Sequence, residues 1–239
     1  MNVFLISSFA SVAFAVLLPG TLRANDVKPI KIAIAGDSTV ADYPANDPIR
    51  GWGQLIGVRF KENVEIKNFA VGGRSTKTFL SEGRWEPMLK VKPDYILMQF
   101  GHNDSHAKDK PESTDANTDY KDYLRKYADE AKAAGIQIIF ITPMHRRTFD
   151  KDGEPSKELL PYANAMKEVA SEKKIECIDL HNSSGLLFKR LGDEGSADLS
   201  CSPNDRTHFS KKGAETMAGL ITEELKGLSS GLKNYLKNP

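Results

Sequence analysis

The sequence predicts an α/β domain in which helices cover both faces of a five-stranded parallel sheet. Short apolar runs, typical of buried strands, alternate five times with segments of helical periodicity, and such alternation favours parallel strands with right-handed crossovers. The first three runs end in glycine and polar residues, which is typical of the turn after a buried strand. We expect the flavodoxin-like strand order 2-1-3-4-5, a three-layer arrangement that places the first strand centrally.

Each element is expected from a local pattern. The expected strands are residues 32–35, 64–71, 95–100, 136–142 and 175–180. The expected helices are residues 52–60, part of 76–92, 119–134, 157–173, 184–191 and a last helix after residue 210. Gly135 is a candidate C-terminal cap and Ser210 a candidate N-terminal cap. The tail, residues 227–239, is rich in Gly, Ser, Lys and Asn and is expected to fray.

The composition is that of one globular domain. The chain has 239 residues, of which 40% are hydrophobic and 27% charged, and this argues against disorder. The formal net charge is only +1, so no nucleic-acid partner is expected. Cys177 and Cys201 permit a disulfide in an exported protein, while the apolar run around Cys177 equally fits a buried free thiol. Two cysteines without histidines at ligand spacing predict no zinc site.

The N-terminal segment differs from the rest of the chain. Residues 1–18 carry no charge and are mostly apolar, Pro19 and Gly20 interrupt the run, and Ala24 offers a small residue at a cleavage point. We therefore predict a signal peptide over residues 1–24 and a single domain over residues 25–239. No lysine or arginine precedes the apolar run, so an uncleaved anchor or a buried segment stays open. A secreted or periplasmic monomer, free of the membrane after cleavage, is the expectation.

Candidate groups for acyl transfer follow three of the expected strands. Ser38 follows the first strand, at the edge where open α/β sheets bind ligands, and is a candidate nucleophile. Acyl transfer also needs donors for the developing oxyanion and a base with an orienting partner. The backbone N–H groups of Ser38 and Gly73 and the side-chain amide of Asn103 are candidate donors. Asp205 and His208 lie three residues apart, a spacing that lets the carboxylate orient the imidazole.

Cationic side chains are expected at the rim of the same site. The candidates are Arg74 after the second strand and His145, Arg146 and Arg147 after the fourth. The planar fork of arginine suits a sugar carboxylate, so these four residues are candidate substrate-binding groups. Two alternatives stay open: residues 145–147 form a solvated charge cluster, and Arg74 supports the Gly73 loop.

The remaining histidines and one tryptophan have other expected places. His102 is expected to shape the third loop, and His106 and His181 are expected to lie at the surface. Trp52 is expected to pack beneath the site loops, with a sugar platform as the alternative.

Four blocks of this sequence resemble those of the SGNH, or GDSL-type, hydrolases. The blocks are Gly36-Asp37-Ser38, Gly73, Gly101-x-Asn103-Asp104 and Asp205-x-x-His208. Longer segments around them look like the rhamnogalacturonan acetylesterases over about residues 30–225. The resemblance implies the SGNH hydrolase fold, Ser38 as nucleophile, His208 as base and Asp205 as its orienting partner. It also implies an oxyanion hole formed by Ser38, Gly73 and Asn103.

The same resemblance implies an activity. A serine esterase of this kind removes O-acetyl groups from pectin-type polysaccharide or oligosaccharide through an acetyl-enzyme, with no metal or cofactor. The loops over residues 105–118 and 148–154 match no one characterised esterase, so deacetylation of xylan or another glycan stays open. Lipase or thioesterase action would need an apolar groove, which these polar loops do not favour. A non-catalytic carbohydrate-binding protein is opposed by the complete set of four blocks.

Overall fold

The structure, a computed structural model, describes residues 28–237, and the signal peptide predicted over residues 1–24 lies outside the described residues. Five parallel strands form one sheet in the order β2-β1-β3-β4-β5, which confirms the expected order. The strands are β1 (Ile30–Gly36), β2 (Val64–Asn68), β3 (Tyr95–Gln99), β4 (Gln137–Ile141) and β5 (Cys177–Ile178).

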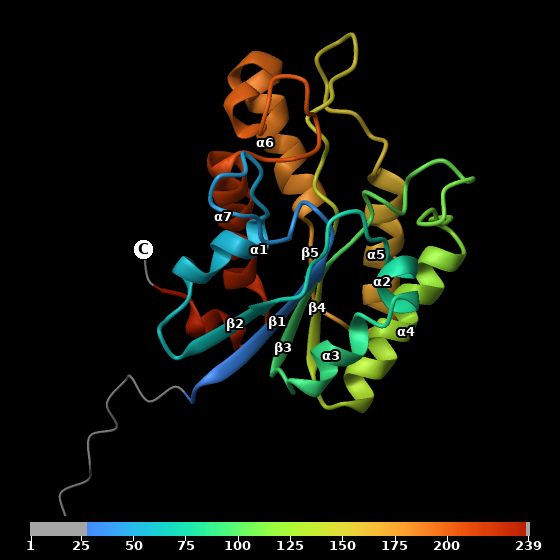
Figure 1. The fold of residues 1–239 in the computed structure, drawn as a ribbon, viewed down its shortest axis with the longest axis vertical. Coiled ribbons are helices and arrows are strands. Elements are labelled where there is room, and N and C mark those ends of the chain that lie inside the picture. Colours follow the sequence, from blue (N-terminus) through green and yellow to red (C-terminus); the bar gives the residue numbers. More distant parts are fainter. Residues whose placement is uncertain (1–27, 238–239) are drawn as a thin grey trace, which may run out of the picture.

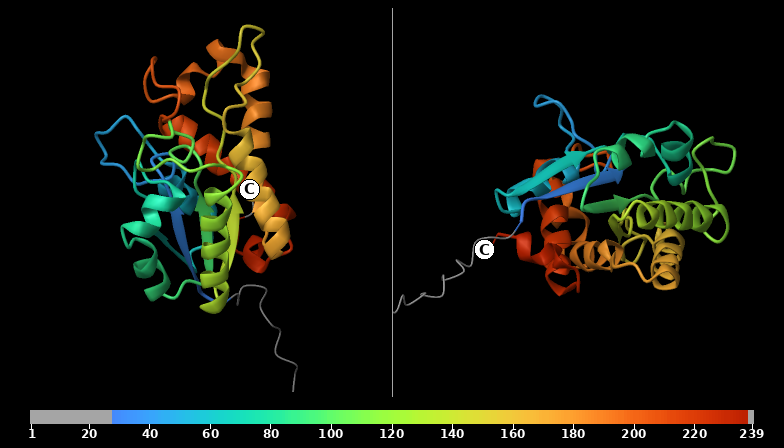
Figure 2. Two further views of the ribbon diagram at one scale, coloured as in Figure 1. Left: turned by 90° about the vertical axis from the view of Figure 1, so that its right-hand side faces the viewer. Right: turned by 90° about the horizontal axis from the view of Figure 1, so that it is seen from below.

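Helices cover both faces of the sheet and complete the three layers (Figures 1 and 2). One face carries α1 (Trp52–Leu55), α6 (Leu180–Gly195) and α7 (Lys211–Gly227). The other carries α2 (Thr76–Ser81), α3 (Trp85–Lys90), α4 (Asp119–Ala133) and α5 (Leu160–Lys173). Three short 3₁₀ helices are η1 (Ile56–Arg59), η2 (Ala197–Leu199) and η3 (Gly231–Tyr235).

The alternation of side chains along β1 divides the apolar core into two layers. Ile32 and Ile34 pack toward α7, whereas Ala33 and Ala35 face the layer of α4 and α5. All four side chains are fully buried. β1 is therefore packed on both faces, and the turn that follows it starts from a rigid support.

Several expected boundaries differ from the structure: the second strand ends at Asn68, not at residue 71, and the helix expected over 184–191 spans Leu180–Gly195. The end of the fifth strand and the tail also differ, and each of these differences has a local cause. The fifth strand ends at Ile178 because Asp179 caps α6, its carboxylate accepting from the backbone N–H of Asn182. The tail was expected to fray, yet η3 buries Leu232 and the segment continues as an antiparallel bridge to Phe60.

Both cysteines are free thiols. Over residues 28–237 no helix combines the length and apolar content that a membrane crossing requires.

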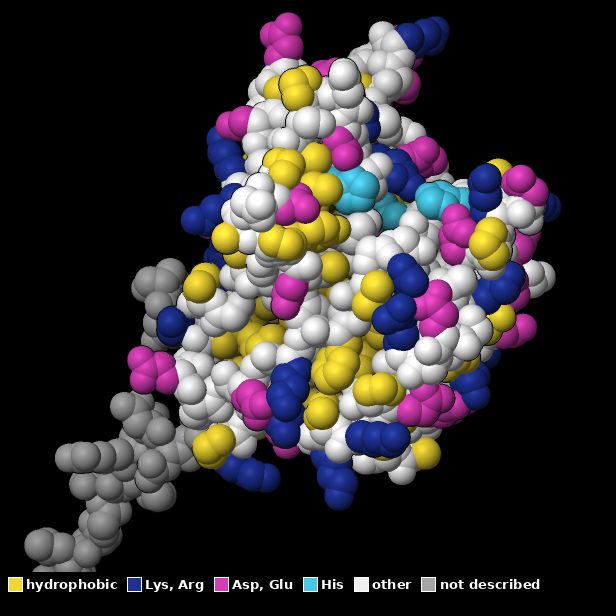
Figure 3. Space-filling view, in the orientation of Figure 1, with side chains coloured by type: hydrophobic (Ala, Val, Ile, Leu, Met, Phe, Trp, Pro, Cys, Tyr) yellow, Lys and Arg dark blue, Asp and Glu magenta, His cyan; other side chains and the backbone are white. Residues whose placement is uncertain are grey.

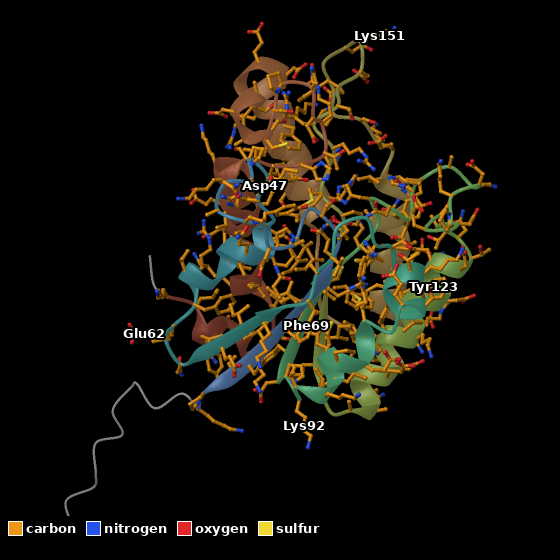
Figure 4. The ribbon with its side chains drawn as sticks, in the orientation of Figure 1. Asp47, Glu62, Phe69, Lys92, Tyr123 and Lys151 are labelled. Carbon is orange, nitrogen blue, oxygen red and sulfur yellow. The ribbon has the colours of Figure 1, made fainter. Side chains whose placement is uncertain are left out.

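The loops at the carboxyl end of the sheet lie together at one end of the molecule. Asp47, in the loop after β1, and Lys151, in the loop after β4, both lie in the upper part of Figure 4. Lys92, which precedes β3, lies at the opposite end. The candidate residues for acyl transfer are thus carried by loops that share one edge of the sheet.

Candidate active site

Ser38 lies in a tight turn that the end of β1 permits. A Cβ atom on Gly36 would lie 2.5 Å from Val40 Cγ2, at the end of the turn, and 3.0 Å from the carbonyl oxygen of Gln99 on β3, so only glycine fits here without a shift of its neighbours. The buried Asp37 carboxylate accepts hydrogen bonds from the Thr39 backbone N–H (2.9 Å) and hydroxyl (2.7 Å). These bonds close the turn and leave Ser38 half-buried at its apex.

Asp37 and His102 join the first and third loops beneath Ser38. The Asp37 Oδ2 and His102 Nδ1 atoms lie 3.6 Å apart, and both side chains are buried. Burial acts to raise the pKa of Asp37, but His102 and the Thr39 hydrogen bonds outweigh it and hold that pKa below its usual value. Asp37 is therefore an ionised structural group, and His102 shapes the third loop as expected.

The structure brings Ser38, His208 and Asp205 into one chain of hydrogen bonds. The Ser38 Oγ–His208 Nε2 distance is 2.9 Å, and the His208 Nδ1–Asp205 Oδ2 distance is 2.8 Å. Because the carboxylate is acceptor-only, Nδ1 carries the proton and Nε2 is left to accept the Ser38 proton. This is the arrangement that a serine nucleophile requires of its base.

The Asp205 carboxylate is held by the backbone of the same loop. Its Oδ1 atom accepts from the N–H groups of Thr207 (2.8 Å) and His208 (2.7 Å). Burial opposes ionisation, but these bonds and the His208 ring lower the pKa of Asp205 to about 2. The orienting carboxylate therefore stays charged at any pH near neutrality.

The three candidate oxyanion donors lie on the loops after β1, β2 and β3. In the part of the chain that the structure describes, the Ser38 and Gly73 N–H groups donate to no protein acceptor. Gly73 has φ of +79°, a conformation that favours glycine. Asn103 uses one Nδ2 proton to donate to the Arg74 carbonyl oxygen (3.0 Å), and its second proton is left for a ligand.

A buried carboxylate supports the third loop next to Asn103. Asp104 accepts from the Thr76 backbone and hydroxyl at the start of α2, and from the Thr114 hydroxyl (3.0 Å). Burial is the main influence and raises the pKa of Asp104 to about 7. The loop that presents Asn103 is therefore anchored by an acid that titrates near neutral pH.

Two of the four cations expected at the rim hold site loops together. Arg74 donates from Nη1 to the Gly72 carbonyl oxygen (2.8 Å) and pairs through Nε with Glu82 (3.0 Å). Arg146 donates from Nη2 to the His102 carbonyl oxygen (3.0 Å) and from Nη1 to Thr207. Both guanidinium groups are partly exposed beside the site, so a role in substrate binding stays a prediction for them.

The expectation of a rim position is wrong for the other two cations. The Arg147 side chain is 3% exposed, and its Nη1 atom binds the carboxylate and carbonyl of Asp193. His145 is buried and stacks on His181, with ring centroids 3.9 Å apart. Burial and the adjacent ring lower the pKa of His145 to about 4, so the ring is neutral. Packing against His181 and the pair with Asp193 bury these two side chains, and neither partner is adjacent in the sequence.

The expectation for His181 is also wrong, because its side chain is buried and Nδ1 donates to the Pro143 carbonyl oxygen (3.1 Å). His106 is exposed, as expected. Trp52 packs fully buried, with its indole N–H donating to the Gln99 side chain (2.8 Å), which supports the packing role over a sugar platform.

The sequence did not predict the contacts of two residues near the site, Tyr43 and Asp193. Tyr43, in the loop after β1, donates from its hydroxyl to the Ser38 carbonyl oxygen (2.8 Å). Asp193 pairs with Arg206, which lies directly beside Asp205 in the chain. Neither had a recognisable signal, because a tyrosine in a polar turn and an aspartate late in a helix are common at any surface.

Ser38, Asp205 and His208 are each partly exposed to solvent. Histidine side chains are visible in the upper part of Figure 3, at the end toward which the strands of Figure 1 point, beside lysine and arginine side chains. Within residues 28–237, no cluster of three or more His, Cys, Asp or Glu side chains is arranged to hold a metal ion.

Comparisons with known proteins agree with this geometry. A sequence model described as the GDSL-like Lipase/Acylhydrolase family matches residues 34–216. The chain is 38% identical over 224 residues to the rhamnogalacturonan acetylesterase RhgT of Bacillus subtilis (strain 168), covering 87% of this chain and 95% of that protein. It is 29% identical over 228 residues to a rhamnogalacturonan acetylesterase of Emericella nidulans, covering 84% of each chain.

A solved structure gives the same result for the fold. The crystal structure of the Bacillus subtilis protein YxiM superimposes with a TM-score of 0.76 at 31% sequence identity. The superposition covers 85% of this chain and 58% of the YxiM chain.

Proposed function

Because the chain belongs to the GDSL-like lipase/acylhydrolase family and is a carboxylic ester hydrolase, we propose that it deacetylates pectin-type polysaccharide, rhamnogalacturonan above others. The observation that carries the proposal is the Ser38–His208 contact of 2.9 Å between residues 170 positions apart in the chain. A fold has no structural need to bring a serine hydroxyl and an imidazole together at its exposed edge, whereas acyl transfer requires it. The name of the relative RhgT supports the choice of substrate.

The proposed reaction proceeds in two halves. Ser38 Oγ attacks the acetyl carbonyl carbon while its proton passes to His208 Nε2, which gives a tetrahedral oxyanion. The oxyanion accepts hydrogen bonds from the Ser38 and Gly73 N–H groups and from the free Nδ2 proton of Asn103. His208 then gives the proton to the departing sugar oxygen as the bond between that oxygen and the acetyl carbon breaks, and the sugar leaves with a free hydroxyl. Water repeats the sequence on the acetyl-enzyme and releases acetate.

Asp205 supplies the electrostatic support for this cycle. Its carboxylate holds Nδ1–H of His208 and so fixes the tautomer in which Nε2 is the base. When His208 takes the proton, the imidazolium lies 2.8 Å from a carboxylate whose pKa is about 2, and the ion pair is stabilised.

Export belongs to the same proposal, because a polymeric plant-wall substrate cannot enter a cell. The uncharged apolar run over residues 1–18 supports a signal peptide, with cleavage after Ala24. N-terminal sequencing of protein collected outside the producing cell tests this, and a mature chain that still begins at Met1 would contradict it.

The activity is tested by acetate release from acetylated rhamnogalacturonan, homogalacturonan and xylan, with wild type and Ser38→Ala assayed side by side. We expect the fastest release from rhamnogalacturonan and a loss of at least about 10⁴-fold in Ser38→Ala. Faster release from xylan would overturn the proposed substrate. Equal activity of wild type and Ser38→Ala would overturn the role of Ser38.

A further inference from the structure

The loop that carries the base lies outside the regular structure of the fold. Residues 201–208 contain no helix or strand, and the segment is joined to its surroundings by bridges at its ends, Ser200 to Phe209 and Arg50 to Phe209. Two hydrogen bonds of the proposed triad nevertheless need this loop at a defined position. Other contacts must therefore hold its middle part.

Arg147 provides the first of these contacts from the loop after β4. Its guanidinium is buried and donates from Nε to the Ser200 hydroxyl (2.8 Å) and from Nη1 to the Asp193 carbonyl oxygen (2.7 Å). Nη1 also pairs with the Asp193 carboxylate and reaches the Ser196 hydroxyl at 3.3 Å. A buried guanidinium costs free energy unless it is paired, so Asp193 is required by Arg147.

Asp193 extends the network to the base loop itself. The same Oδ1 atom that pairs with Arg147 accepts from Arg206 Nη1 at 2.5 Å. The Arg206 carbonyl oxygen accepts from the Arg147 backbone N–H at 2.6 Å, and Arg206 Nη1 lies 3.4 Å from the Arg147 carbonyl oxygen. Arg206 is thus held by both its backbone and its side chain, and it is the residue between Asp205 and Thr207.

We propose that Arg147, Asp193 and Arg206 form a clamp that positions Asp205 and His208 for catalysis. This inference rests on the proposed function, because it assigns the clamp to the base of that reaction. None of the three side chains contacts Ser38, His208 or the Asp205 carboxylate through a hydrogen bond, so they are positioning residues. A displacement of about 1 Å of a reacting group can lower the rate about 10²-fold. The clamp therefore acts on turnover and leaves substrate binding unchanged.

Asp193→Asn is the test variant, because it removes the charge shared by the two arginines. We expect kcat for acetate release to fall about 10- to 100-fold with KM within about twofold of wild type. Asp193→Glu, which keeps the carboxylate, should recover most of that loss. The matched control is Asp129→Asn, which removes an exposed ion pair with Lys173 (2.8 Å) on α4 and α5 and should leave kcat unchanged.

A second variant guards against a folding defect in Asp193→Asn. Arg206→Gln removes the side-chain pair but keeps the backbone bond to Arg147, and the Arg206 side chain is already partly exposed. We expect the same separation of kcat from KM, with a smaller fall, in a protein whose circular dichroism matches wild type. If both variants are folded and keep kcat within twofold of wild type, the clamp has no positioning role and the inference is overturned.

Covalent labelling separates this inference from the proposed substrate. The rate at which a fluorophosphonate labels Ser38 depends on the base and needs no polysaccharide. A wild type that is labelled but releases no acetate contradicts the proposed function, while slower labelling of Asp193→Asn still supports the clamp. Equal labelling rates in folded wild type and Asp193→Asn overturn the clamp whatever the substrate is.

Discussion

The nucleophile and its base are held in the active site by different means. The Ser38 turn follows β1, an interior strand of the sheet, and behind it a buried series of hydrogen bonds runs from Asp37 through Thr39 and Gln99 to Trp52. The His208 loop contains no helix or strand, and an exposed carboxylate, Asp193, joins it to the loop after β4. The first support follows from the sheet, and the second from side chains that are remote in sequence.

The nucleophile half of the site, which is the loops that carry Ser38, Gly73 and Asn103, and the base half, which is residues 201–208, therefore tolerate different substitutions. Parallel strands in register place the ends of β1, β2 and β3 next to one another whatever the loop sequences are. The base half has no such template, and each of its side-chain contacts, such as the pair of Asp193 with Arg206, can be removed by one substitution. We therefore expect substitutions far from Ser38 to lower turnover mainly through the base half, and the variants below test the comparison.

The largest effect is expected for Asp205→Asn, in the base half. An amide at this position can donate to the imidazole and so favours the tautomer in which Nε2 carries the proton and cannot act as base. The expected loss in kcat is about 10⁴-fold, close to that of Ser38→Ala. Acetate release at saturating substrate measures it.

The control for Asp205→Asn is its thermal unfolding, which should show a folded protein at the assay temperature. A loss smaller than tenfold in the folded variant would mean that the backbone around His208 orients the ring without the carboxylate. In that case the clamp of Arg147, Asp193 and Arg206 would not be needed to position Asp205 for catalysis.

A smaller effect is expected for Asn103→Ala, in the nucleophile half. The variant removes one oxyanion donor, which typically lowers kcat about 10²- to 10³-fold. It also removes the Nδ2 bond to the Arg74 carbonyl oxygen, so the Gly73 N–H loses part of its support. Measuring kcat and KM separately checks the assignment, since a change confined to KM would place Asn103 in substrate binding instead.

The sequence predicts more of the nucleophile half of the site than of the base half. Ser38, Gly73 and Asn103 were predictable because each follows an apolar strand run, and the strand order brings those ends together. Asp205 and His208 were predictable as a pair from their spacing. Their meeting with Ser38 came from a resemblance, since no local pattern places a loop from the end of the chain beside the first strand.

The unpredicted part consists of long-range side-chain partners. His145, Arg146 and Arg147 are adjacent in sequence, yet they contact His181, Thr207 and Asp193 respectively. Charge alone gives each of them the same expected place at the rim. Packing against α6 and the base loop decides otherwise, and neither contact has a signature in the sequence. The tail was mispredicted for the same reason, because its buried leucines are sparse among polar residues.

A modest effect is expected for Tyr43→Phe, which tests the turn of the nucleophile half. The hydroxyl donates to the Ser38 carbonyl oxygen, and burial raises the pKa of Tyr43 to about 12, so it remains a donor. Losing one such bond costs about 0.5–1.5 kcal/mol, or roughly two- to tenfold in kcat if the turn alone depends on it.

Tyr123→Phe is the control for Tyr43→Phe, because Tyr123 lies on α4 (Figure 4) and its hydroxyl, unlike that of Tyr43, does not donate to the Ser38 turn. It should leave kcat unchanged. A fall of more than about 10²-fold in Tyr43→Phe would show that the turn depends on a single side chain as the base loop does, and the contrast between the halves would disappear.

The smallest effect on turnover, and a distinct effect on stability, is expected for Asp104→Asn. Both halves bury a charged group, but Arg147 is paired with a carboxylate, whereas Asp104 has only neutral donors and its pKa is raised to about 7. Between the ordinary value of 3.8 and about 7, the folded protein binds a proton at Asp104 that the unfolded chain has lost. The contribution of Asp104 to the free energy of unfolding is therefore largest below pH 4. It falls as the pH rises to about 7 and does not change at higher pH.

The Asn variant lacks this titration, while its amide oxygen can still accept from Thr76 and keep the loop in place. Urea unfolding at several pH values between 4 and 8 should show a wild-type stability that falls relative to Asp104→Asn by up to about 4 kcal/mol. Parallel stability curves for the two proteins would show that the Asp104 carboxylate is already ionised at pH 4. The Asp104 carboxylate would then add no pH dependence to the stability of the nucleophile half.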